Sequence, residues 1–225
     1  MRELTASAAR SLFHLGIRAK LASSPPWRNQ LESAGNESFK LDGCEIRFFK
    51  CDPKRHLGYH KPSWPGNFSQ SNPDISALFY ADPDITFIAP WKFFEEWTGC
   101  GVALCADSNF PRVSQNHPWR CEWAELIVAS GRQIANAVED YANSGLFGIR
   151  RQDAAFLDCW VDLTETFERR GGNTRTFNMS EHTRSITGDQ DLMAAAMMAY
   201  SGRLSFLGPE AMGFTGHYFI LFACH

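Results

Sequence analysis

Two aspartates separated by one residue follow an apolar run near the middle of the chain. The run ALFYA (77–81) is short enough to be a buried strand, and Asp82 and Asp84 flank Pro83 directly after it. Pro83 restricts the backbone and strand alternation would point both carboxylates the same way, so two hard oxygen ligands could converge on one Mg²⁺ or Mn²⁺. The alternative is an ordinary turn between two strands, which is the commoner case for an isolated Asp-Pro-Asp.

A second pair of aspartates, Asp189 and Asp191, flanks Gln190 at the start of a nearly all-apolar helical pattern (191–200). One interpretation is structural, with Asp189 as the N-cap and Asp191 as a first-turn carboxylate that the helix dipole favours. The other is functional, because a helix N-terminus beyond a sheet edge is where a phosphate or a sugar hydroxyl would be bound. Taken alone, the residues favour the structural interpretation.

Single polar or aromatic residues elsewhere are further candidates for binding a ligand. Asp107 lies two residues beyond the apolar run GVALC (101–105), where it could bind a hydroxyl group or simply be a solvated loop carboxylate. Asn143 and Gly145 belong to a predicted turn, in which Gly145 supplies backbone freedom. Trp119, in the predicted loop NHPWR, is the tryptophan best placed to stack on a carbohydrate, whereas core packing is expected for the others.

Short apolar runs alternate with helical patterns in the part of the chain that must position these residues. The runs at 77–81, 85–88, 101–105 and 146–149 predict buried strands. One-sided apolar patterns predict helices over 120–141 and 153–170, and the nearly all-apolar pattern at 191–200 predicts a buried helix. This alternation predicts an α/β domain with a mixed, mainly parallel sheet and helices on both faces. In open sheets of this kind, ligands bind beyond the carboxyl ends of the strands.

The first part of the chain has weaker signals. Residues 1–43 have a helix-compatible start followed by a passage rich in Ser, Pro, Asn and Glu, with no clear period. CEIRFF (44–49) predicts a short strand, and a loop-rich stretch with four prolines continues to residue 76. We therefore expect a poorly defined segment at 1–43 and one folded domain at 44–225.

The composition of the chain indicates which classes of binding partner are not expected. The chain has 225 residues, 44% of them hydrophobic, which allows one substantial core. Its net charge of -3 is spread through the sequence and predicts no nucleic-acid partner. No run approaches the roughly 20 apolar residues of a membrane-spanning helix, and we expect no signal peptide. Seven cysteines without CxxC spacing favour reduced thiols, a cytoplasmic location and no structural zinc.

Several segments resemble one family in the same order. LFYADPDITF, followed by PWKFFEEW and GVALCAD, resembles the centre of bacterial GT-A-fold glycosyltransferases related to the glycogenin and lipopolysaccharide galactosyltransferase group. NSGLFGIRR (143–151), the helix beginning RQDAAFLDCW and GDQDLMAAAM (188–197) are similar to later segments of that group. The resemblance spans residues 57–225 and implies a single GT-A-like, nucleotide-diphospho-sugar transferase domain.

The resemblance also implies roles for individual residues. In this family the Asp-x-Asp pair holds the metal, here Mn²⁺ or Mg²⁺, and a histidine at the end of a late strand completes the ligand set. That histidine corresponds to His225, or less well to His217. A Lys-Pro pair often precedes the Asp-x-Asp strand, which points to Lys61. The implied catalytic residues are Asp189, Gln190 and Asp191, and the implied substrate-binding residues are Lys61, Asp107, Asn143 and Gly145.

The activity implied is that of a metal-dependent hexosyltransferase. It would move a sugar from a nucleoside-diphosphate sugar to a hydroxyl group of a carbohydrate or glycolipid acceptor. The family's first strand and nucleotide-binding turn are not recognisable in residues 1–40, and its Gly-x-x-Lys-Pro-Trp stretch is missing after His225. Two alternatives therefore stay open, namely an inactive GT-A-like remnant, truncated at both ends, that binds nucleotide sugars, and a metal-dependent phosphohydrolase.

Overall fold

The computed structural model describes residues 54–176 and 185–213, together with five short strands outside these ranges. Contacts divide the chain into two compact units, residues 1–53 and 54–225. The first unit holds a sheet in the order β1-β4-β3-β2. Its strands are β1 (Leu12–His14), β2 (Glu32–Ser33), β3 (Ser38–Leu41) and β4 (Cys44–Arg47). Contrary to the helix-compatible start, Leu12–His14 is a strand, and β4 pairs with β1 and β3 in this first unit.

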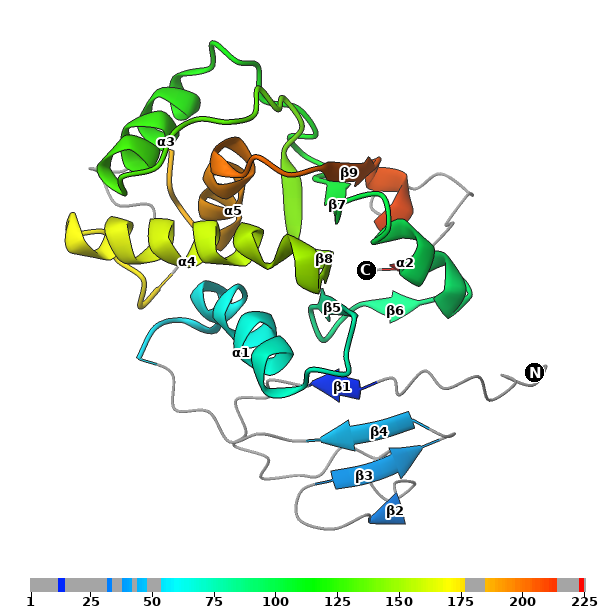
Figure 1. Ribbon diagram of the computed structural model, residues 1–225. Coiled ribbons are helices and arrows are strands. Elements are labelled where there is room, and N and C mark those ends of the chain that lie inside the picture. Colours follow the sequence, from blue (N-terminus) through cyan, green and yellow to red (C-terminus); the bar gives the residue numbers. More distant parts are fainter. Residues whose placement is uncertain are drawn as a thin grey trace. The chain divides into compact units, whose positions relative to one another are not determined.

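A four-stranded sheet forms the centre of the second unit, in the order β5-β8-β7-β9 (Figure 1). Its strands are β5 (Ala77–Ala81), β7 (Val102–Ala106), β8 (Ala142–Arg150) and β9 (Leu204–Leu207). β8 runs antiparallel to both β5 and β7, whereas β9 is parallel to β7. The prediction of a mixed sheet is confirmed. The prediction that it is mainly parallel is wrong for this sheet, because its longest strand runs against both neighbours.

Helices cover both faces of this sheet, as predicted (Figure 1). The helices are α1 (Ser63–Ser71), α2 (Trp91–Trp97), α3 (Pro118–Ala129), α4 (Ala154–Arg169) and α5 (Asp189–Ala199). Alternation along β7 separates two cores: Val102 and Leu104 pack with α3, α4 and α5, whereas Ala103 and Cys105 pack with Phe94 of α2. All of these β7 side chains are fully buried, which explains the uninterrupted apolar run.

The helix predicted over 120–141 is shorter than expected. α3 ends at Ala129 because Gly131 adopts a left-handed conformation, with a φ of 81°. The N–H of Gly131 donates to Val128 O (3.0 Å) and that of Arg132 to Ile127 O (3.1 Å), which is the hydrogen-bond pattern of a Schellman cap. Apolar residues beyond this glycine continued the helical period only by coincidence, and Ile134 is exposed.

Two other segments also differ from the prediction. The run at 85–88 does not join the main sheet, because β6 (Thr86–Phe87) pairs with β10 (Ala223–Cys224) in a separate antiparallel pair. The loop-rich stretch before residue 76 contains the 3-10 helix η2 (Leu57–His60) and helix α1. Two more 3-10 helices, η3 (Arg151–Asp153) and η4 (Pro209–Met212), precede α4 and follow β9.

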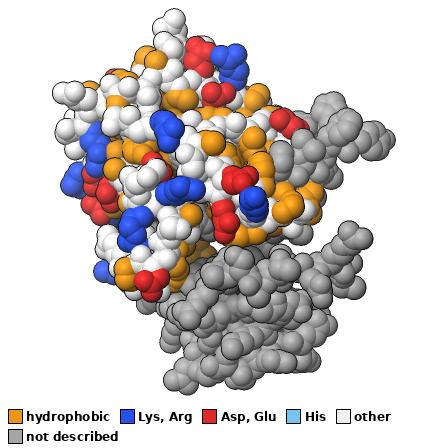
Figure 2. All heavy atoms as spheres, turned by 45° about the vertical axis from the view of Figure 1, so that its right-hand side comes forward, with side chains coloured by type: hydrophobic (Ala, Val, Ile, Leu, Met, Phe, Trp, Pro, Cys, Tyr) orange, Lys and Arg blue, Asp and Glu red, His pale blue; other side chains and the backbone are white. Residues whose placement is uncertain are grey.

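The surface and the cysteines give little further guidance to function. Figure 2 shows a face on which acidic and basic side chains are interspersed instead of gathered by sign. In the described part of the chain, no helix has the length and apolar character needed to cross a membrane. Cys105 and Cys159 are buried free thiols, and Cys100 and Cys121 are exposed free thiols.

Candidate functional site

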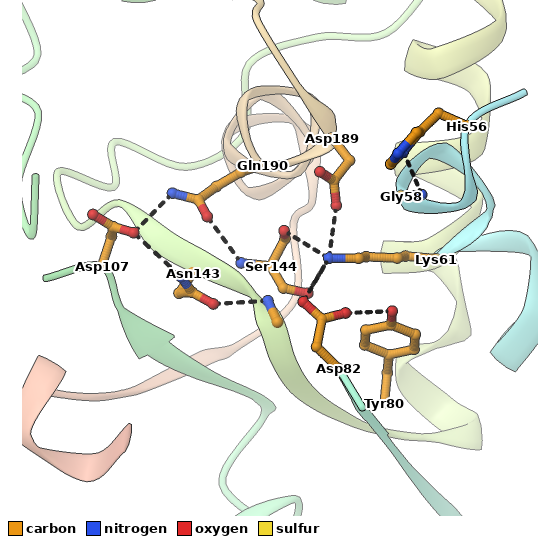
Figure 3. Close-up of polar contacts among 11 residues, drawn as sticks. His56, Gly58, Lys61, Tyr80, Asp82, Asp107, Asn143, Ser144, Asp189 and Gln190 are labelled. Atoms are coloured by element: carbon orange, nitrogen blue, oxygen red, sulfur yellow. Dashed lines mark hydrogen bonds and ion pairs between the residues drawn. The ribbon is translucent and has the colours of Figure 1, made fainter. Parts of the chain in front are cut away.

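Polar side chains from separate segments of the second unit meet at one end of the four-stranded sheet (Figure 3). β5 and β7 both run antiparallel to β8, so their carboxyl ends flank the first half of β8. Backbone hydrogen bonds extend this pairing beyond the strands. The N–H of Asp82 donates to Gly145 O and that of Asp107 to Tyr141 O, both at 2.8 Å. Asp82 and Asp107 therefore lie on opposite sides of β8.

The first turn of α5 completes this arrangement. The side-chain oxygen of Gln190 accepts a hydrogen bond from the Ser144 N–H at 3.2 Å, so the helix begins against the start of β8. Most of the candidates predicted from the sequence are thus brought together. The residues of the site are Lys61 after η2, Asp82 after β5, Asp107 after β7, Asn143, Ser144 and Gly145 in β8, and Asp189 and Gln190 in α5.

Lys61 lies at the centre of the site, and only 8% of its surface is exposed. Its ammonium group is 3.2 Å from Asp82 Oδ2 and 3.1 Å from Asp189 Oδ2. It also donates to the Ser144 side chain at 3.1 Å and to the Ser144 carbonyl at 3.3 Å, and lies 5.3 Å from the centre of the Tyr80 ring. One positive charge therefore separates two carboxylates that would otherwise repel each other.

Asp189 differs from the other acidic residues of the site. It is buried, and its contact with Lys61 is an ion pair that lacks hydrogen-bond geometry. Among the described residues, no group donates a hydrogen bond to Asp189 Oδ2. A buried acceptor without a donor is costly, so this oxygen is suited to accept a hydrogen bond from a ligand.

Tyr80 holds the carboxylate of Asp82 from the other side. Its hydroxyl donates to Asp82 Oδ1 at 2.6 Å, while its ring stacks on Phe147 with centroids 5.1 Å apart. Burial, and then the negative charge of Asp82, raise the pKa of Tyr80 far above its ordinary value. The phenol therefore stays protonated and remains a hydrogen-bond donor to Asp82.

The Asp-Pro-Asp segment is a turn, not a continuation of the strand. The strand ends at Ala81, and the N–H of Ile85 donates to Asp82 O at 3.1 Å, which closes a turn with Pro83 at its second position. Strand alternation therefore does not set the directions of the two carboxylates. Asp82 is partly buried, whereas Asp84 is exposed at the edge of the site.

The acidic residues can be tested for their fit to a divalent cation. Mg²⁺ usually binds through one or two carboxylates together with substrate phosphates, and Asp82 and Asp84 offer such an open set of hard oxygen ligands. Within the ranges 54–176 and 185–213, no group of three or more His, Cys, Asp or Glu side chains forms a metal cluster. His225 and His217 lie outside the described residues. The described residues thus offer a cation the exposed Asp84 and Asp82, whose two oxygens also accept from Tyr80 and Lys61.

Asp107 anchors the opposite end of the site. Its Oδ1 accepts hydrogen bonds from the N–H groups of Asn109 (2.8 Å) and Phe110 (3.1 Å). Its Oδ2 accepts from the side-chain amides of Asn143 (3.3 Å) and Gln190 (3.1 Å). Burial raises the pKa of Asp107, but these four hydrogen bonds together outweigh it and hold the pKa below its ordinary value. Asp107 is therefore a carboxylate at neutral pH.

Gly145 contributes space and a backbone donor. A Cβ atom at this position would lie 2.8 Å from Asn143 Oδ1 and 3.0 Å from Asp82 Oδ2, closer than such contacts occur. The N–H of Gly145 donates to Asn143 Oδ1 at 2.8 Å. Because Gly145 has no side chain, the Asp82 carboxylate and the Asn143 side chain can lie close to the backbone of β8 at this position.

Asp191 points into the protein and behaves as a cap. Gly188, not Asp189, is the N-cap residue of α5, and the Gly188 N–H donates to Asp191 Oδ2 at 3.2 Å. The N–H and the hydroxyl of Thr187 also donate to Oδ2, at 2.8 Å and 3.1 Å, and the Tyr141 hydroxyl donates to Oδ1 at 2.6 Å. Burial raises the pKa of Asp191, although these hydrogen bonds oppose the shift. The contacts of Asp191 therefore match the structural interpretation, in which this carboxylate caps the first turn of α5.

Two site residues were not selected from the sequence. Tyr80 lies in β5, two positions before Asp82, and its hydroxyl reaches the carboxylate just beyond the end of the strand. Ser144 lies inside the segment that supplied Asn143 and Gly145, but its contact with Lys61 has no local signal. Trp119 lies in the first turn of α3, where its ring contacts Phe110 and His117.

Comparisons with known proteins give matches among solved structures. No family model matches the chain, and no curated protein matches it. Among solved structures, the chain is similar to a glycosyltransferase involved in the glycosylation of the major capsid of PBCV-1. The TM-score is 0.47 and the sequence identity 10%, over 81% of this chain and 80% of that chain.

Proposed function

We propose that the chain is a glycosyltransferase that takes a nucleoside-diphosphate sugar as donor and a carbohydrate or glycolipid hydroxyl as acceptor. The observation that carries this proposal is the convergence around Lys61. A buried cation, two carboxylates and two amides meet at one end of the sheet. These groups suit a ligand that combines an anionic diphosphate with a hydroxyl-rich sugar. The same segments are those that resemble the GT-A family.

Lys61 is proposed to stabilise the leaving group. Negative charge on the nucleoside diphosphate increases as the glycosidic C–O bond breaks, and a preorganised cation lowers the energy of that state. The Lys61 ammonium is held by Asp82, Asp189 and Ser144, so it needs little reorganisation when the charge develops. Its burial strengthens the interaction, since little water competes at this position.

Asp189 and the two amides are proposed to hold the sugar. Asp189 Oδ2 is buried without a hydrogen-bond donor among the described groups, and a sugar hydroxyl would satisfy it. Its negative charge would also stabilise the positive charge that develops on the sugar ring in an oxocarbenium-like transition state. Gln190 follows Asp189 in α5 and Asn143 precedes Ser144 in β8, and both amides are proposed to contact other sugar oxygens.

Asp82 and Asp84 are proposed to hold Mn²⁺ or Mg²⁺ together with the donor diphosphate. A bound cation would act as a Lewis acid that neutralises the charge of the leaving group. Tyr80 and Lys61 would keep Asp82 oriented for this role, because both donate to its carboxylate.

Isothermal titration of the chain with UDP, UDP-glucose, UDP-galactose and GDP-mannose tests the proposal. Each ligand is titrated once with Mn²⁺ and once with EDTA. We expect at least one nucleotide sugar to bind in Mn²⁺ and to bind much more weakly in EDTA. Binding of none of them would remove the proposed donor site, and release of inorganic phosphate from a bound nucleotide would favour a phosphohydrolase instead. Binding without transfer to any acceptor would favour the inactive remnant.

Substitution of Asp84 tests the metal assignment. Asp84→Ala should abolish the Mn²⁺-dependent part of donor binding and leave the fold intact, because Asp84 is exposed in a turn. Asp74→Ala is the matched control, since Asp74 is also exposed, follows a proline and precedes β5. Unchanged donor affinity of Asp84→Ala in Mn²⁺ would exclude Asp84 from the metal site.

A further inference from the structure

The carboxylate of Asp107 has no acceptor capacity left for a ligand. A carboxylate offers about four lone-pair sites on its two oxygens. In Asp107 two protein donors occupy each oxygen: the N–H groups of Asn109 and Phe110 on Oδ1, and the amides of Asn143 and Gln190 on Oδ2. Asp107 is also only 7% exposed. Direct binding of a sugar hydroxyl by this carboxylate would require the loss of one of these contacts.

These contacts determine which way the two amides face. The Asn143 side chain donates to Asp107 and accepts from the Gly145 N–H, and the Gln190 side chain donates to Asp107 and accepts from the Ser144 N–H. A rotation of either amide by 180° would bring its oxygen against a carboxylate and its NH₂ group against a backbone N–H. Both amides therefore have one orientation.

The orientation decides what the amides can offer to a ligand. Each NH₂ group has two N–H bonds, and the contact with Asp107 uses one of them. In the part of the chain that the structure describes, no protein acceptor contacts the second N–H of Asn143. The Gln190 side chain, in contrast, is also hydrogen-bonded to Tyr141. Both amide oxygens are already bound by backbone N–H groups. Each of these oxygens keeps one further lone pair, and the second N–H of Asn143 is the donor that stays available to a ligand.

We infer that Asp107 is a positioning residue that holds the Asn143 amide so that it presents an N–H donor to the sugar of the donor substrate. This inference rests on the proposed function. It assigns the recognition of a sugar oxygen as hydrogen-bond acceptor to Asn143 and gives Asp107 no direct contact with the ligand. Asp189 has the complementary role, because its buried oxygen can only accept. The site then recognises a sugar through a donor on one side and an acceptor on the other.

Asp107→Asn tests this role with little change in shape. The new side-chain oxygen can keep the hydrogen bonds from Asn109 and Phe110, so the loop after β7 should fold. Its NH₂ group would then face the NH₂ groups of Asn143 and Gln190, and these donors would lose their acceptor. We expect the affinity for the nucleotide sugar that binds the wild-type chain to fall at least about tenfold, the loss of one or two hydrogen bonds. The affinity for UDP or GDP alone should not change, because these ligands lack the sugar.

The double variant Asp107→Asn/Gln190→Glu separates positioning from folding. The carboxylate at position 190 could accept from the new amide and from the Ser144 N–H, so the hydrogen bonds return with donor and acceptor exchanged. We expect its melting temperature to return to the wild-type value while the sugar-dependent affinity stays low. It also covers the case in which Asp107→Asn alone is too unstable to assay.

The possible outcomes distinguish this role from the proposed function. If the wild-type chain binds no nucleotide sugar, the proposed function is wrong and the role of Asp107 fails with it. If the wild-type chain binds but Asp107→Asn binds the sugar nucleotide equally well, only the positioning role is overturned. An equal loss of affinity for the nucleotide alone would make Asp107 merely structural. Recovery of sugar affinity in the double variant would overturn the inference that an N–H donor of Asn143 recognises the sugar.

Discussion

At the scale of single residues, the site is built from charges and polar groups that hold one another in place. Asp189 and Asp191 are two positions apart in the first turn of α5, yet their surroundings give them different roles. Asp189 faces Lys61 and has an oxygen without a donor, whereas Asp191 accepts hydrogen bonds from Thr187, Gly188 and Tyr141. The chemistry available to each carboxylate follows from its partners, not from its residue type.

Tyr80→Phe should weaken metal-dependent binding with little effect on stability. The variant keeps the ring that stacks on Phe147 and loses the hydroxyl that orients Asp82. Loss of such a supporting group typically lowers metal affinity by about tenfold or more. Titration with Mn²⁺ and the nucleotide sugar measures this, and wild-type affinity would show that Tyr80 does not orient Asp82.

Tyr200→Phe is the matched control for this prediction. It also removes one hydroxyl from a carboxylate, but the affected group is Asp153, which precedes α4. Since Asp153 is buried, we expect a loss of about 1–3 kcal/mol in the free energy of unfolding. Donor affinity should remain close to the wild-type value in the folded protein.

At the scale of elements, β8 decides where the site forms. It pairs with β5 on one side and β7 on the other, and its antiparallel direction brings their carboxyl ends to its own first residues. Close packing on this strand depends on small residues. Gly148 lies opposite Phe79, and a Cβ atom there would lie 2.4 Å from the Phe79 ring.

Gly148→Ala should therefore destabilise the protein. The Phe79 ring packs against Trp91, Phe94 and Trp97, with centroids 5.4 to 6.0 Å away, so it has little room to move. Overpacking of this kind costs about 1–3 kcal/mol, which urea unfolding would detect. Gly66→Ala in α1 is the control, because its nearest neighbour would be the Leu157 side chain at 3.8 Å and alanine favours a helix. Equal stability of the two variants would contradict the packing described for β8.

At the scale of the whole molecule, the second unit holds Lys61 in place through contacts that are distant in sequence. Arg55 forms two hydrogen bonds with Glu168 near the end of α4, at 2.7 Å and 2.5 Å. The His56 N–H donates to Thr174 O at 2.8 Å, and the Thr174 hydroxyl also contacts Glu168. These contacts attach the chain before η2 to the helical face of the sheet, and Lys61 follows directly after η2.

The Arg55–Glu168 pair predicts a specific dependence of stability on pH. The hydrogen bonds from Arg55 lower the pKa of Glu168, although burial opposes the shift. A carboxyl group with a lowered pKa stabilises the fold above its unfolded pKa of about 4.3, and this contribution is lost as the pH falls through the folded pKa. Glu168→Gln should lose up to about 1 kcal/mol at pH 7, since the pair is partly exposed.

Melting temperatures measured from pH 7 to pH 3 test this dependence. We expect the difference between wild type and Glu168→Gln to shrink as the pH falls below about 4.3. Glu165→Gln is the control, because Glu165 is exposed on the same helix. A constant difference between wild type and Glu168→Gln across this range would show that the pair contributes nothing through its charge.

The sequence alone determined the elements and the positions of most candidate side chains. Apolar runs predicted the strands that became β5, β7 and β8, a one-sided pattern predicted α4, and a nearly all-apolar pattern predicted α5. Asp82 and Asp107 were correctly expected just beyond strand ends. These features depend on neighbouring residues, because periodicity and turn chemistry are local properties of the chain.

Only the tertiary structure decided how these elements are ordered and which side chains meet. Nothing local shows that β8 runs between β5 and β7, that Lys61 lies between Asp82 and Asp189, or that Asp191 faces inward. The partners of Asp107 are as far away as Gln190, 83 residues along the chain. A charged or amide side chain can bond only to groups that strand pairing and helix packing bring within hydrogen-bond distance. Its partners are therefore a property of the folded molecule.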